Sequence, residues 1–243
     1  MSDRLRFLLL QVRNSGDPMI SQEVDCFASS LGCGTEQIHV FDLLTGVPTR
    51  MQIAAVDAVL LGGSGDYSVA RGGPWLEAAL DAMRDLHLLS KPTFASCWGF
   101  QAMARALGGQ VVTDLSCAEL GTEELRLTME GTRDPVFGPM GSPFLAHVGH
   151  QDTVTVLPSD AVLLASTDRV TNQAFRIRGK PIYCTQFHPE LTIASMVERL
   201  QAYPEYIPKI LGIPLEEFVA ELRETPEANA LLRRFVADAV IRS

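Results

Sequence analysis

The chain has 243 residues, a formal net charge of −9 at pH 7 and a hydrophobic fraction of 47%. The hydrophobic fraction suffices for a packed core, and a charged fraction of 20% argues against a disordered chain. The acidic balance provides no basic field for nucleic acid or an anionic membrane surface, so neither is an expected partner.

No apolar run approaches the roughly 20 residues of a membrane span, and the first residues lack the long apolar stretch of a signal peptide. A cytoplasmic protein with reduced thiols is therefore expected. Its cysteines are scattered without CxxC spacing, so we expect neither a metal site nor a cofactor. The five cysteines are Cys26, Cys33, Cys97, Cys117 and Cys184.

In the first part of the chain, short apolar runs alternate with segments of helical period. This pattern predicts βα units and a mainly parallel sheet, an α/β fold with helices on both faces. The predicted strands are Arg6–Val12, Gln37–Phe41, Asp57–Leu61 and Pro92–Ser96. The predicted helices are Ser21–Leu31 with Gly32 after its end, Trp75–Leu89 with Pro74 as its first residue, and about Trp98–Leu107 before Gly108-Gly109.

The middle of the chain contains several short β-like runs, which predict an antiparallel or mixed extension of the sheet. These runs are Glu124–Met129, Thr153–Val156, Val162–Ser166, Ala174–Ile177 and Ile182–Cys184. From Ile193 the pattern is helical, with breaks at Pro204, Pro208, Gly212-Ile213-Pro214 and Pro226. We expect one domain over 1–243, with a core of about 5–191 and a helical extension of about 192–243. The extension is a candidate for subunit contact in a homo-oligomer.

The run Thr93–Gln101 (TFASCWGFQ) carries the first chemical signal. An apolar strand enters a small–x–Cys–x–Gly turn and continues into a helix, which is the nucleophile-elbow pattern with Cys97 in place of serine. A thiol at a helix N-terminus lies at the positive end of the helix dipole, which favours the thiolate. A buried structural cysteine is the alternative interpretation.

The second signal is the run Gln186–Glu190 (QFHPE), which follows a short β run. A cysteine nucleophile needs a base, and the base needs an acceptor that fixes its tautomer. His188 fits the base and Glu190 fits the acceptor. By itself a histidine at a strand end is more often a satisfied or solvent-facing residue.

A glycine-rich turn, Gly62-Gly63-Ser64-Gly65, follows the third predicted strand. Loops at the carboxyl ends of parallel strands meet at one edge of the sheet, where free N–H groups can stabilise an oxyanion. We assign one oxyanion donor to Gly63 and the other to the N–H of Trp98. A plain turn and a phosphate loop are the alternatives, but the Gly-Lys-Ser/Thr of a Walker loop is absent.

Together, ASCWGFQ, QFHPE, the glycine turn and AHVGHQDTV resemble the class I (triad) glutamine amidotransferases, and most of all the free-standing domain related to the glutaminase part of GMP synthetase. The resemblance implies a flavodoxin-like fold and hydrolysis of a γ-carboxamide through a γ-glutamyl thioester. It also implies that Cys97, His188 and Glu190 form the catalytic triad. His147 and His150 are weaker alternatives for the base.

The resemblance further implies that Gln101 contacts the α-amino acid end of the substrate. It implies that the segment His147–Asp152 is a loop closing the other side of the pocket, with His150, Gln151 and Asp152 as substrate-binding residues. Two positions depart from the family pattern. Ala95 replaces a glycine of the elbow, and Ser64 replaces the proline of a Gly-Gly-Pro turn, which makes that turn less rigid.

Three functions remain open at this point. The leading one is hydrolysis of glutamine or a related γ-glutamyl amide, with ammonia passing to a separate synthetase subunit, because the roughly 50 residues after Glu190 are too few for an ATP-using acceptor domain. The second is a γ-glutamyl hydrolase or peptidase acting on γ-glutamyl peptides or conjugates. The third is a catalytically idle regulatory module, against which the intact triad argues.

Overall fold

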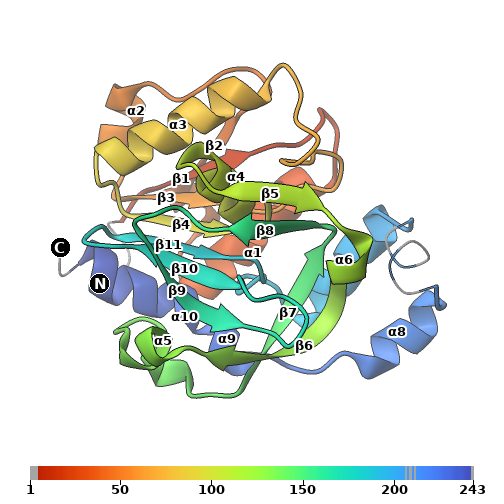
Figure 1. Cartoon of the computed structure of the whole chain (residues 1–243). Coiled ribbons are helices and arrows are strands. Elements are labelled where there is room, and N and C mark those ends of the chain that lie inside the picture. Colours follow the sequence, from red (N-terminus) through yellow and green to blue (C-terminus); the bar gives the residue numbers. More distant parts are fainter. Residues whose placement is uncertain (1–4, 206, 208–209, 211, 242–243) are drawn as a thin grey trace.

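The computed structural model describes residues 5–205, 207, 210 and 212–241 (Figure 1). Within these residues the main sheet has nine strands, in the order β2-β1-β3-β4-β11-β10-β9-β6-β7. Its parallel half consists of β2 (Ile38–Asp42), β1 (Phe7–Gln11), β3 (Ala58–Leu61), β4 (Thr93–Ser96) and β11 (Ile182–Thr185). The antiparallel half consists of β10 (Ala174–Ile177), β9 (Ala161–Ser166), β6 (Glu119–Leu127) and β7 (Phe144–His150). A two-stranded sheet pairs β5 (Gln110–Thr113) with β8 (Asp152–Val156).

The parallel half confirms the flavodoxin-like α/β fold. Its strand order of β2-β1-β3-β4-β11 is the doubly wound order, in which ligands bind beyond the carboxyl ends of the strands. The loops after β3, β4 and β11 therefore lie at one edge of the sheet, and these are the three loops with the chemical signals.

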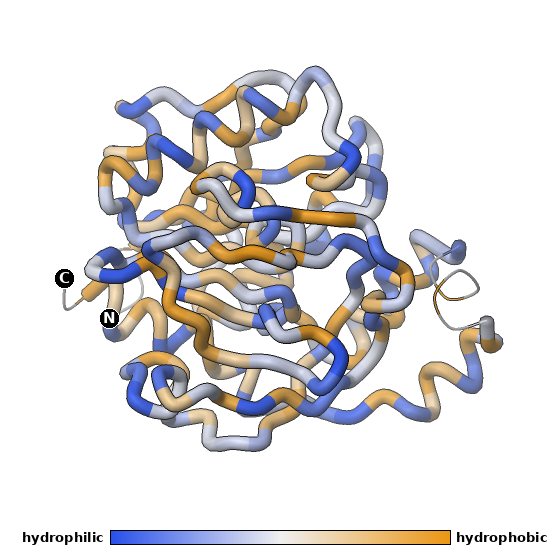
Figure 2. The backbone as a smooth tube through the Cα atoms, viewed as in Figure 1, coloured by the Kyte–Doolittle hydropathy of each residue, from blue (hydrophilic) through white to orange (hydrophobic). Residues whose placement is uncertain are grey.

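The helices cover both faces because side chains alternate along the strands. Phe7 and Leu9 of β1 belong to the core beneath α1, α9 and α10, whereas Leu8 and Leu10 belong to the core beneath α2, α3 and α4 (Figure 1). The helices on these faces are α1 (Met19–Leu31), α2 (Arg50–Ala54), α3 (Leu76–Leu88), α4 (Trp98–Ala106), α9 (Pro226–Asn229) and α10 (Leu231–Phe235). In Figure 2 apolar segments run along the inner strands, and hydrophilic stretches gather at the outer turns.

Most boundaries lie within two residues of the expected ones. Gly32 ends α1 in the left-handed conformation with a φ of 71°, as expected. Pro74 was expected as the first residue of a helix, but α3 begins at Leu76 with Trp75 as its N-cap. Since helix ends fray, such a shift changes nothing in the packing.

The antiparallel extension is confirmed, but two of its strands differ from expectation. β6 begins at Glu119, five residues before the expected run. The segment expected as a closing loop at His147–Asp152 is wrong as a loop, because His147 and His150 belong to β7 and Asp152 begins β8. Pairing with β6 over its whole length overrides the weak strand signal of a segment containing glycine and two histidines.

The helices from Ile193 onward pack against the rest of the protein. Leu200 of α6 (Ile193–Ala202) and Phe218 of α8 (Leu215–Glu221) form a small third cluster with Leu120, whereas α10 packs beneath the parallel strands. The expected break at Pro208 lies outside the described residues; the division of the chain at 191/192 stays a prediction. The remaining short elements are α5 (Met129–Arg133), η2 (Thr35–Gln37), η3 (Leu115–Cys117), η4 (Gly138–Met140) and η5 (Val236–Val240).

Candidate functional site

Cys97 lies at a strained turn between β4 and α4. Its φ of 51° is in the left-handed region, where a non-glycine residue costs about 1–3 kcal/mol. Two neighbours fix this conformation, since the Cys97 N–H donates to Thr185 O at 2.8 Å and the Gln101 N–H donates to Cys97 O. The turn is tight enough to require Gly99, because a Cβ there would lie 2.5 Å from Leu61 Cβ.

His188 and Glu190 lie in the loop after β11, next to Cys97. His188 Nδ1 is 2.7 Å from Glu190 Oε1, and the imidazole lies beside Cys97, whose Sγ donates to Gly149 O at 3.6 Å. Burial by itself lowers the pKa of His188, but the negative charges of Glu190 and Cys97 outweigh it and raise that pKa to about 9. Glu190 is buried as well, which opposes its charge, yet His188 and then Arg199 hold its pKa below the usual range. The carboxylate of Glu190 therefore favours the protonated imidazole of His188.

His147, the weaker alternative for the base, is fully buried. Its Nδ1 is 3.3 Å from Thr122 Oγ1, and its Nε2 has no partner among the described residues. Burial and the nearby positive charge of His188 lower the pKa of His147 to about 4. The backbone of His147 supports the site, because His147 O accepts from the His188 N–H at 2.8 Å.

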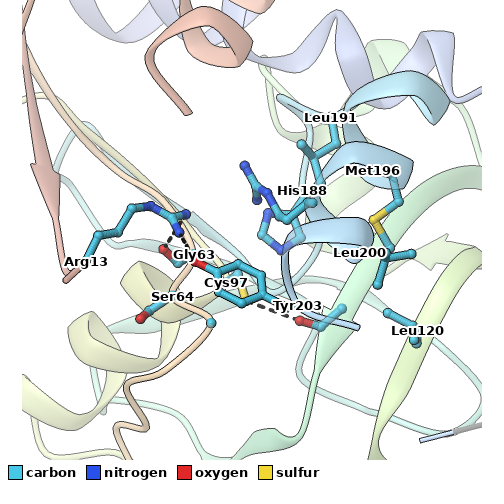
Figure 3. A pocket seen from close by; sticks show the side chains of 13 residues that line it. Arg13, Gly63, Ser64, Cys97, Leu120, His188, Leu191, Met196, Leu200 and Tyr203 are labelled. Atoms are coloured by element: carbon cyan, nitrogen blue, oxygen red, sulfur yellow. Dashed lines mark hydrogen bonds between the residues drawn. The ribbon is translucent and has the colours of Figure 1, made fainter. Parts of the chain in front are cut away.

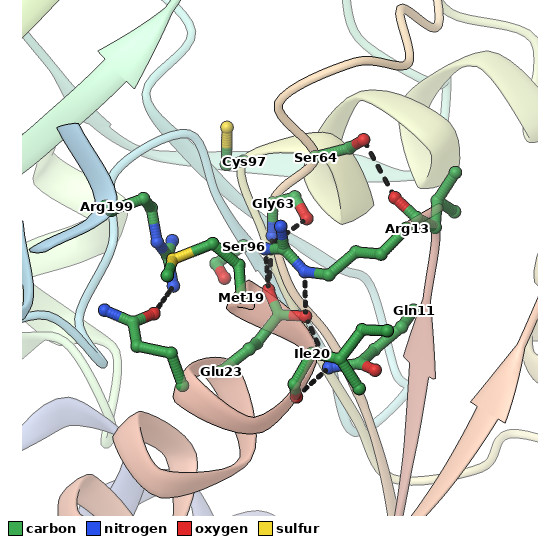
Figure 4. Close-up of polar contacts among 12 residues, drawn as sticks. Gln11, Arg13, Met19, Ile20, Glu23, Gly63, Ser64, Ser96, Cys97 and Arg199 are labelled. Carbon is green, nitrogen blue, oxygen red and sulfur yellow. Dashed lines mark hydrogen bonds and ion pairs between the residues drawn. The ribbon is translucent and has the colours of Figure 1, made fainter. Parts of the chain in front are cut away.

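The glycine turn after β3 is held by a buried ion pair from the N-terminal part of the chain (Figure 4). Arg13 Nη2 lies 3.0 Å from Glu23 Oε1 and donates to Gly63 O at 3.2 Å. The Gly63 N–H donates to the same Glu23 oxygen at 3.1 Å. Ser64 Oγ donates to Val12 O at 2.9 Å, which replaces the rigidity that a proline would supply.

Gly63 therefore lies beside the triad with its N–H bonded to Glu23. A Cβ on Gly63 would lie 2.9 Å from His188 Cε1 and 3.7 Å from Cys97 Cβ. The expected oxyanion donor thus has a different orientation here, because the carboxylate of Glu23 is a stronger acceptor than any neutral group. The Trp98 N–H is the first in α4 and has no partner within the helix.

Two cavities meet at Cys97. The first, the polar cavity, has a volume of about 990 Å³ including its opening to solvent. It brings together Gln101, His150, Gln151 and Asp152, the four residues expected to bind substrate. The other residues around it are Ser64, Gly65, Asp66, Tyr67, Ser68, Arg71, Cys97, Trp98, Thr113, Leu115, Gly149 and Glu205.

Three of those four expected residues have their side chains committed inside the protein. Both ring nitrogens of His150 are bonded, Nε2 to Glu119 Oε2 at 3.0 Å and Nδ1 to Asp152 O at 3.1 Å. The carboxylate of Asp152 accepts from Ser68 Oγ, the Ala70 N–H and Thr113 Oγ1. The amide of Gln101 donates to Asp152 O and to Gln186 Oε1.

The role of His150 and Asp152 in binding substrate stays a prediction. In the structure their side chains form a polar frame of the cavity, since their bonds join β8 to the loop after β3 and to β6. Gln151 is half-buried, and its side chain makes no hydrogen bond to the described residues. Of the four residues expected to bind substrate, Gln151 is the one whose side chain has no hydrogen bond to the described part of the chain.

Sequence reasoning missed several residues at this site. Arg71 is an exposed cation on the polar cavity, and Arg13 and Glu23 support the glycine turn from below. Arg13 comes two residues after the end of β1, so the sequence could have placed it at the carboxyl edge of the sheet, where ligands bind. Glu23 on α1 gave no such signal, because an acidic residue on a helix is usually solvated.

The second cavity, the apolar cavity, shares Ser64, Gly65, Cys97 and Gly149 with the first (Figure 3). Its volume is about 470 Å³ including its opening. Its wall includes leucine, methionine and tyrosine side chains together with Cys97, His188 and two arginines. The residues around it are Arg13, Gly63, Ser64, Gly65, Cys97, Leu120, Gly149, His188, Leu191, Met196, Arg199, Leu200 and Tyr203.

In the described part of the chain, no three His, Cys, Asp or Glu side chains are grouped so that they could hold a metal ion. None of the described helices is both long and apolar enough to cross a membrane.

Comparisons with known proteins agree with this geometry. Residues 29–200 match the family model described as glutamine amidotransferase class-I. The GMP synthase (glutamine-hydrolyzing) of Flavobacterium psychrophilum is 30% identical over 186 residues, which are 73% of this chain and 34% of that protein. Gamma-glutamyl peptidase 3 of Arabidopsis thaliana is 26% identical over 207 residues, 83% of this chain and 80% of that protein. The chain thus spans about a third of the first relative and four fifths of the second.

Solved structures with this fold include a glutamine amidotransferase from Thermotoga maritima, with a TM-score of 0.76 and 21% identity over 98% of both chains. A glutamine amidotransferase from Methylobacillus flagellatus has a TM-score of 0.67 and 19% identity, covering 97% of this chain and 95% of that one. At these sequence identities the two solved structures support the fold alone. Because the family model spans more than half of the chain, the protein belongs to the class-I glutamine amidotransferase family.

Proposed function

We propose that the protein hydrolyses γ-glutamyl amides through a γ-glutamyl thioester on Cys97. The observation that carries this proposal is the grouping of three side chains, in which His188 lies beside Cys97 on the wall of one cavity and has its Nδ1 2.7 Å from Glu190 Oε1. A nucleophile, a base and an acceptor that orients the base are the parts that acyl transfer requires.

In this mechanism the Cys97 thiolate attacks the amide carbon, a C–S bond forms and the carbonyl oxygen takes up negative charge. His188 gives its proton to the leaving nitrogen as the C–N bond breaks, which leaves a thioester. Water then attacks the thioester while His188 takes its proton. Glutamate departs, the thiolate is restored, and Glu190 keeps the imidazole in position throughout.

The oxyanion needs donors that face the developing charge. The Trp98 N–H supplies the first donor. The Gly63 N–H supplies a second one only if the Gly62–Gly63 peptide turns away from Glu23 and toward Cys97. The exchange replaces one charge-assisted hydrogen bond by another, and it also breaks the bond that Gly62 O accepts from the Gly99 N–H.

The polar cavity suits the glutamyl group of the substrate. Arg71 offers a cation to the α-carboxylate, and Gln151 offers a free amide. The acidic side chains of Asp66 and Glu205 at the same cavity suit an α-ammonium group. Gln101 acts indirectly, because its amide donates to Asp152 and Gln186 and so helps to hold the wall of the polar cavity.

Glutamine is the default substrate. The relatives named GMP synthase hydrolyse glutamine according to their names, and the one from Methanothermobacter thermautotrophicus is named as a single subunit of such an enzyme. We infer that a synthetase partner would receive the ammonia in that case. Glutaminase activity that rises when a partner is added would support this assignment.

γ-Glutamyl peptides are the second candidate substrates. The match to gamma-glutamyl peptidase 3 covers 80% of that protein, whereas the match to the Flavobacterium GMP synthase covers 34% of its length. Activity of the isolated chain on γ-glutamyl peptides, without a partner, would favour this class.

The decisive experiment measures glutamate release from glutamine and from γ-glutamyl peptides by the wild-type protein and by the Cys97→Ala variant. We expect the variant to lose activity by about 10³-fold or more, because the covalent route disappears. Cys184→Ala is the control, since Cys184 is buried in β11 outside both cavities. Equal activity of wild type and Cys97→Ala would overturn the proposal.

A further inference from the structure

The two cavities at Cys97 differ in whether they contain the general acid. His188 lies on the wall of the apolar cavity and is not among the residues around the polar cavity. The leaving nitrogen must lie within hydrogen-bond reach of the imidazole that protonates it. The substituent on that nitrogen therefore points into the apolar cavity, while the glutamyl carbons extend into the polar cavity.

The apolar cavity is lined by side chains that suit a leaving group larger than ammonia. Its wall comes from Leu120 on β6, Leu191 beyond the triad loop, Met196 and Leu200 on α6, and Tyr203 (Figure 3). The ring of Tyr203 lies against the glycine turn, since a Cβ on Gly65 would be 2.6 Å from it. The unsubstituted amide nitrogen of glutamine would leave this apolar surface uncovered.

Each arginine around the apolar cavity has a carboxylate within 4.0 Å, although Nε and Nη1 of Arg199 make no hydrogen bond to the described residues. Arg13 lies 3.0 Å from Glu23 and 3.4 Å from Asp17, and Arg199 lies 3.7 Å from Glu190 while donating to Gln22 Oε1. No described cation at the wall therefore lacks a carboxylate beside it. A neutral substituent suits this cavity better than one with its own carboxylate.

We propose that the apolar cavity is a leaving-group subsite, and that the preferred substrates are γ-glutamyl amides of small apolar amines. This inference rests on the proposed function, because it places the substrate by the reaction at Cys97. In the reaction the C–N bond breaks, the amine nitrogen receives its proton from His188, and the free amine leaves through the apolar cavity.

The first experiment compares kcat/KM for glutamine and for the methyl-, propyl- and isopentylamides of γ-glutamate. Each methylene buried in the apolar cavity should raise kcat/KM about fourfold, so the isopentylamide should exceed the methylamide by more than tenfold. Values that are flat or fall along the series, with glutamine still hydrolysed, overturn the subsite and leave the proposed function standing. Failure to hydrolyse any member overturns both.

A matched pair of substrates tests the charge argument. γ-Glutamyl-leucine differs from the γ-glutamyl isopentylamide by one carboxylate on the leaving amine. We expect the neutral isopentylamide to have the higher kcat/KM. A clear preference for γ-glutamyl-leucine would overturn the assignment to neutral amines and would show that a cation of the wall receives the carboxylate.

A pair of variants tests whether the preference for larger amines depends on the wall of the apolar cavity. Leu200→Ala should reduce the ratio of kcat/KM for the isopentylamide to that for the methylamide by about threefold or more. Leu80→Ala, a truncation of equal size in the core beneath α3, should keep the wild-type ratio. The ratio is independent of the fraction of folded enzyme. An unchanged ratio in Leu200→Ala, or an equal fall in both variants, would overturn the role of Leu200.

Discussion

The two loops that meet at the candidate site are held in different ways. The turn at Cys97 is fixed by its immediate surroundings, through the bond to Thr185 on the neighbouring strand and the close approach of Gly99 to Leu61. The glycine turn is held from a distance, by Arg13 after β1 and Glu23 on α1. The first loop fixes Cys97, the proposed nucleophile, whereas the second has the Gly63 N–H turned to a carboxylate.

This difference shows that the triad and the oxyanion site need not be prepared together. A strained cysteine and a bonded histidine exist before any substrate arrives. Gly63, the proposed second oxyanion donor, is held by a buried ion pair. Arg13 keeps its charge there because Glu23 and the other acidic neighbours outweigh its burial and raise its pKa. Substitutions on each side test whether the two loops behave as separate units.

We expect the largest effect on activity from Glu190→Gln, which changes the side chain that His188 bonds next to Cys97. The variant should lose about a thousandfold in kcat/KM, because the imidazole loses the acceptor that fixes its tautomer. The raised pKa of His188 predicts an alkaline limb near pH 9 in the wild type, where the proton needed by the leaving amine is lost. Without the carboxylate charge that limb should move to lower pH.

The pH profile of kcat/KM is the measurement, and Glu198→Gln on the exposed side of α6 is the control. The same pKa predicts a stability effect with a definite sign. The folded-state pKa of His188 lies above its usual value of 6.5, so its contribution to stability is complete below about pH 6.5 and is lost as the pH rises through about 9. An alkaline limb that stays in place in Glu190→Gln would contradict the assignment.

On the side of the glycine turn, Glu23→Ala should lower the free energy of unfolding by about 3 kcal/mol. Removing one partner leaves Arg13 buried with only Asp17 as its carboxylate partner, which is costlier than losing the pair. Urea unfolding measures this loss. Glu221→Ala, at an exposed position at the end of α8, should stay within about 0.5 kcal/mol of the wild type. A loss below about 1 kcal/mol would show that the pair does not hold the turn.

Gly63 is the point where the two loops touch. Gly63→Ala should lower kcat by about a hundredfold, because the added Cβ would lie 2.9 Å from His188 Cε1 and must displace the imidazole. Steady-state kinetics measures the effect, and circular dichroism checks that the variant is folded. Activity within threefold of the wild type would mean that the turn moves away from His188 at little cost.

The smallest effect is expected from Ser64→Ala. The hydroxyl donates to Val12 O and accepts from the Tyr67 N–H, so its removal should cost about 1 kcal/mol in the free energy of unfolding. Thermal unfolding against the wild type measures it. No change would show that the backbone of the turn needs no help from the serine.

The parallel half of the sheet was predictable from the sequence, whereas parts of the antiparallel half were not. Buried strands such as Phe7–Gln11 are continuous apolar runs with clear ends. β7 carries His147, Gly149 and His150, whose strand propensity is weak, and it exists because β6 pairs with it along seven residues. A local pattern cannot report such a long-range partner.

The sequence by itself determined that Cys97, His188 and Glu190 lie after strands at one edge of the sheet, because the elbow and the QFHPE run are local patterns with a definite spacing at strand ends. Only the tertiary structure decided what those groups face. It turned the Gly63 N–H to Glu23, committed His150 and Asp152 to internal bonds, and placed the apolar cavity on the His188 side. Each of these depends on contacts between residues far apart in the chain, where burial makes a charge or a polar group bond to whatever partner the fold supplies.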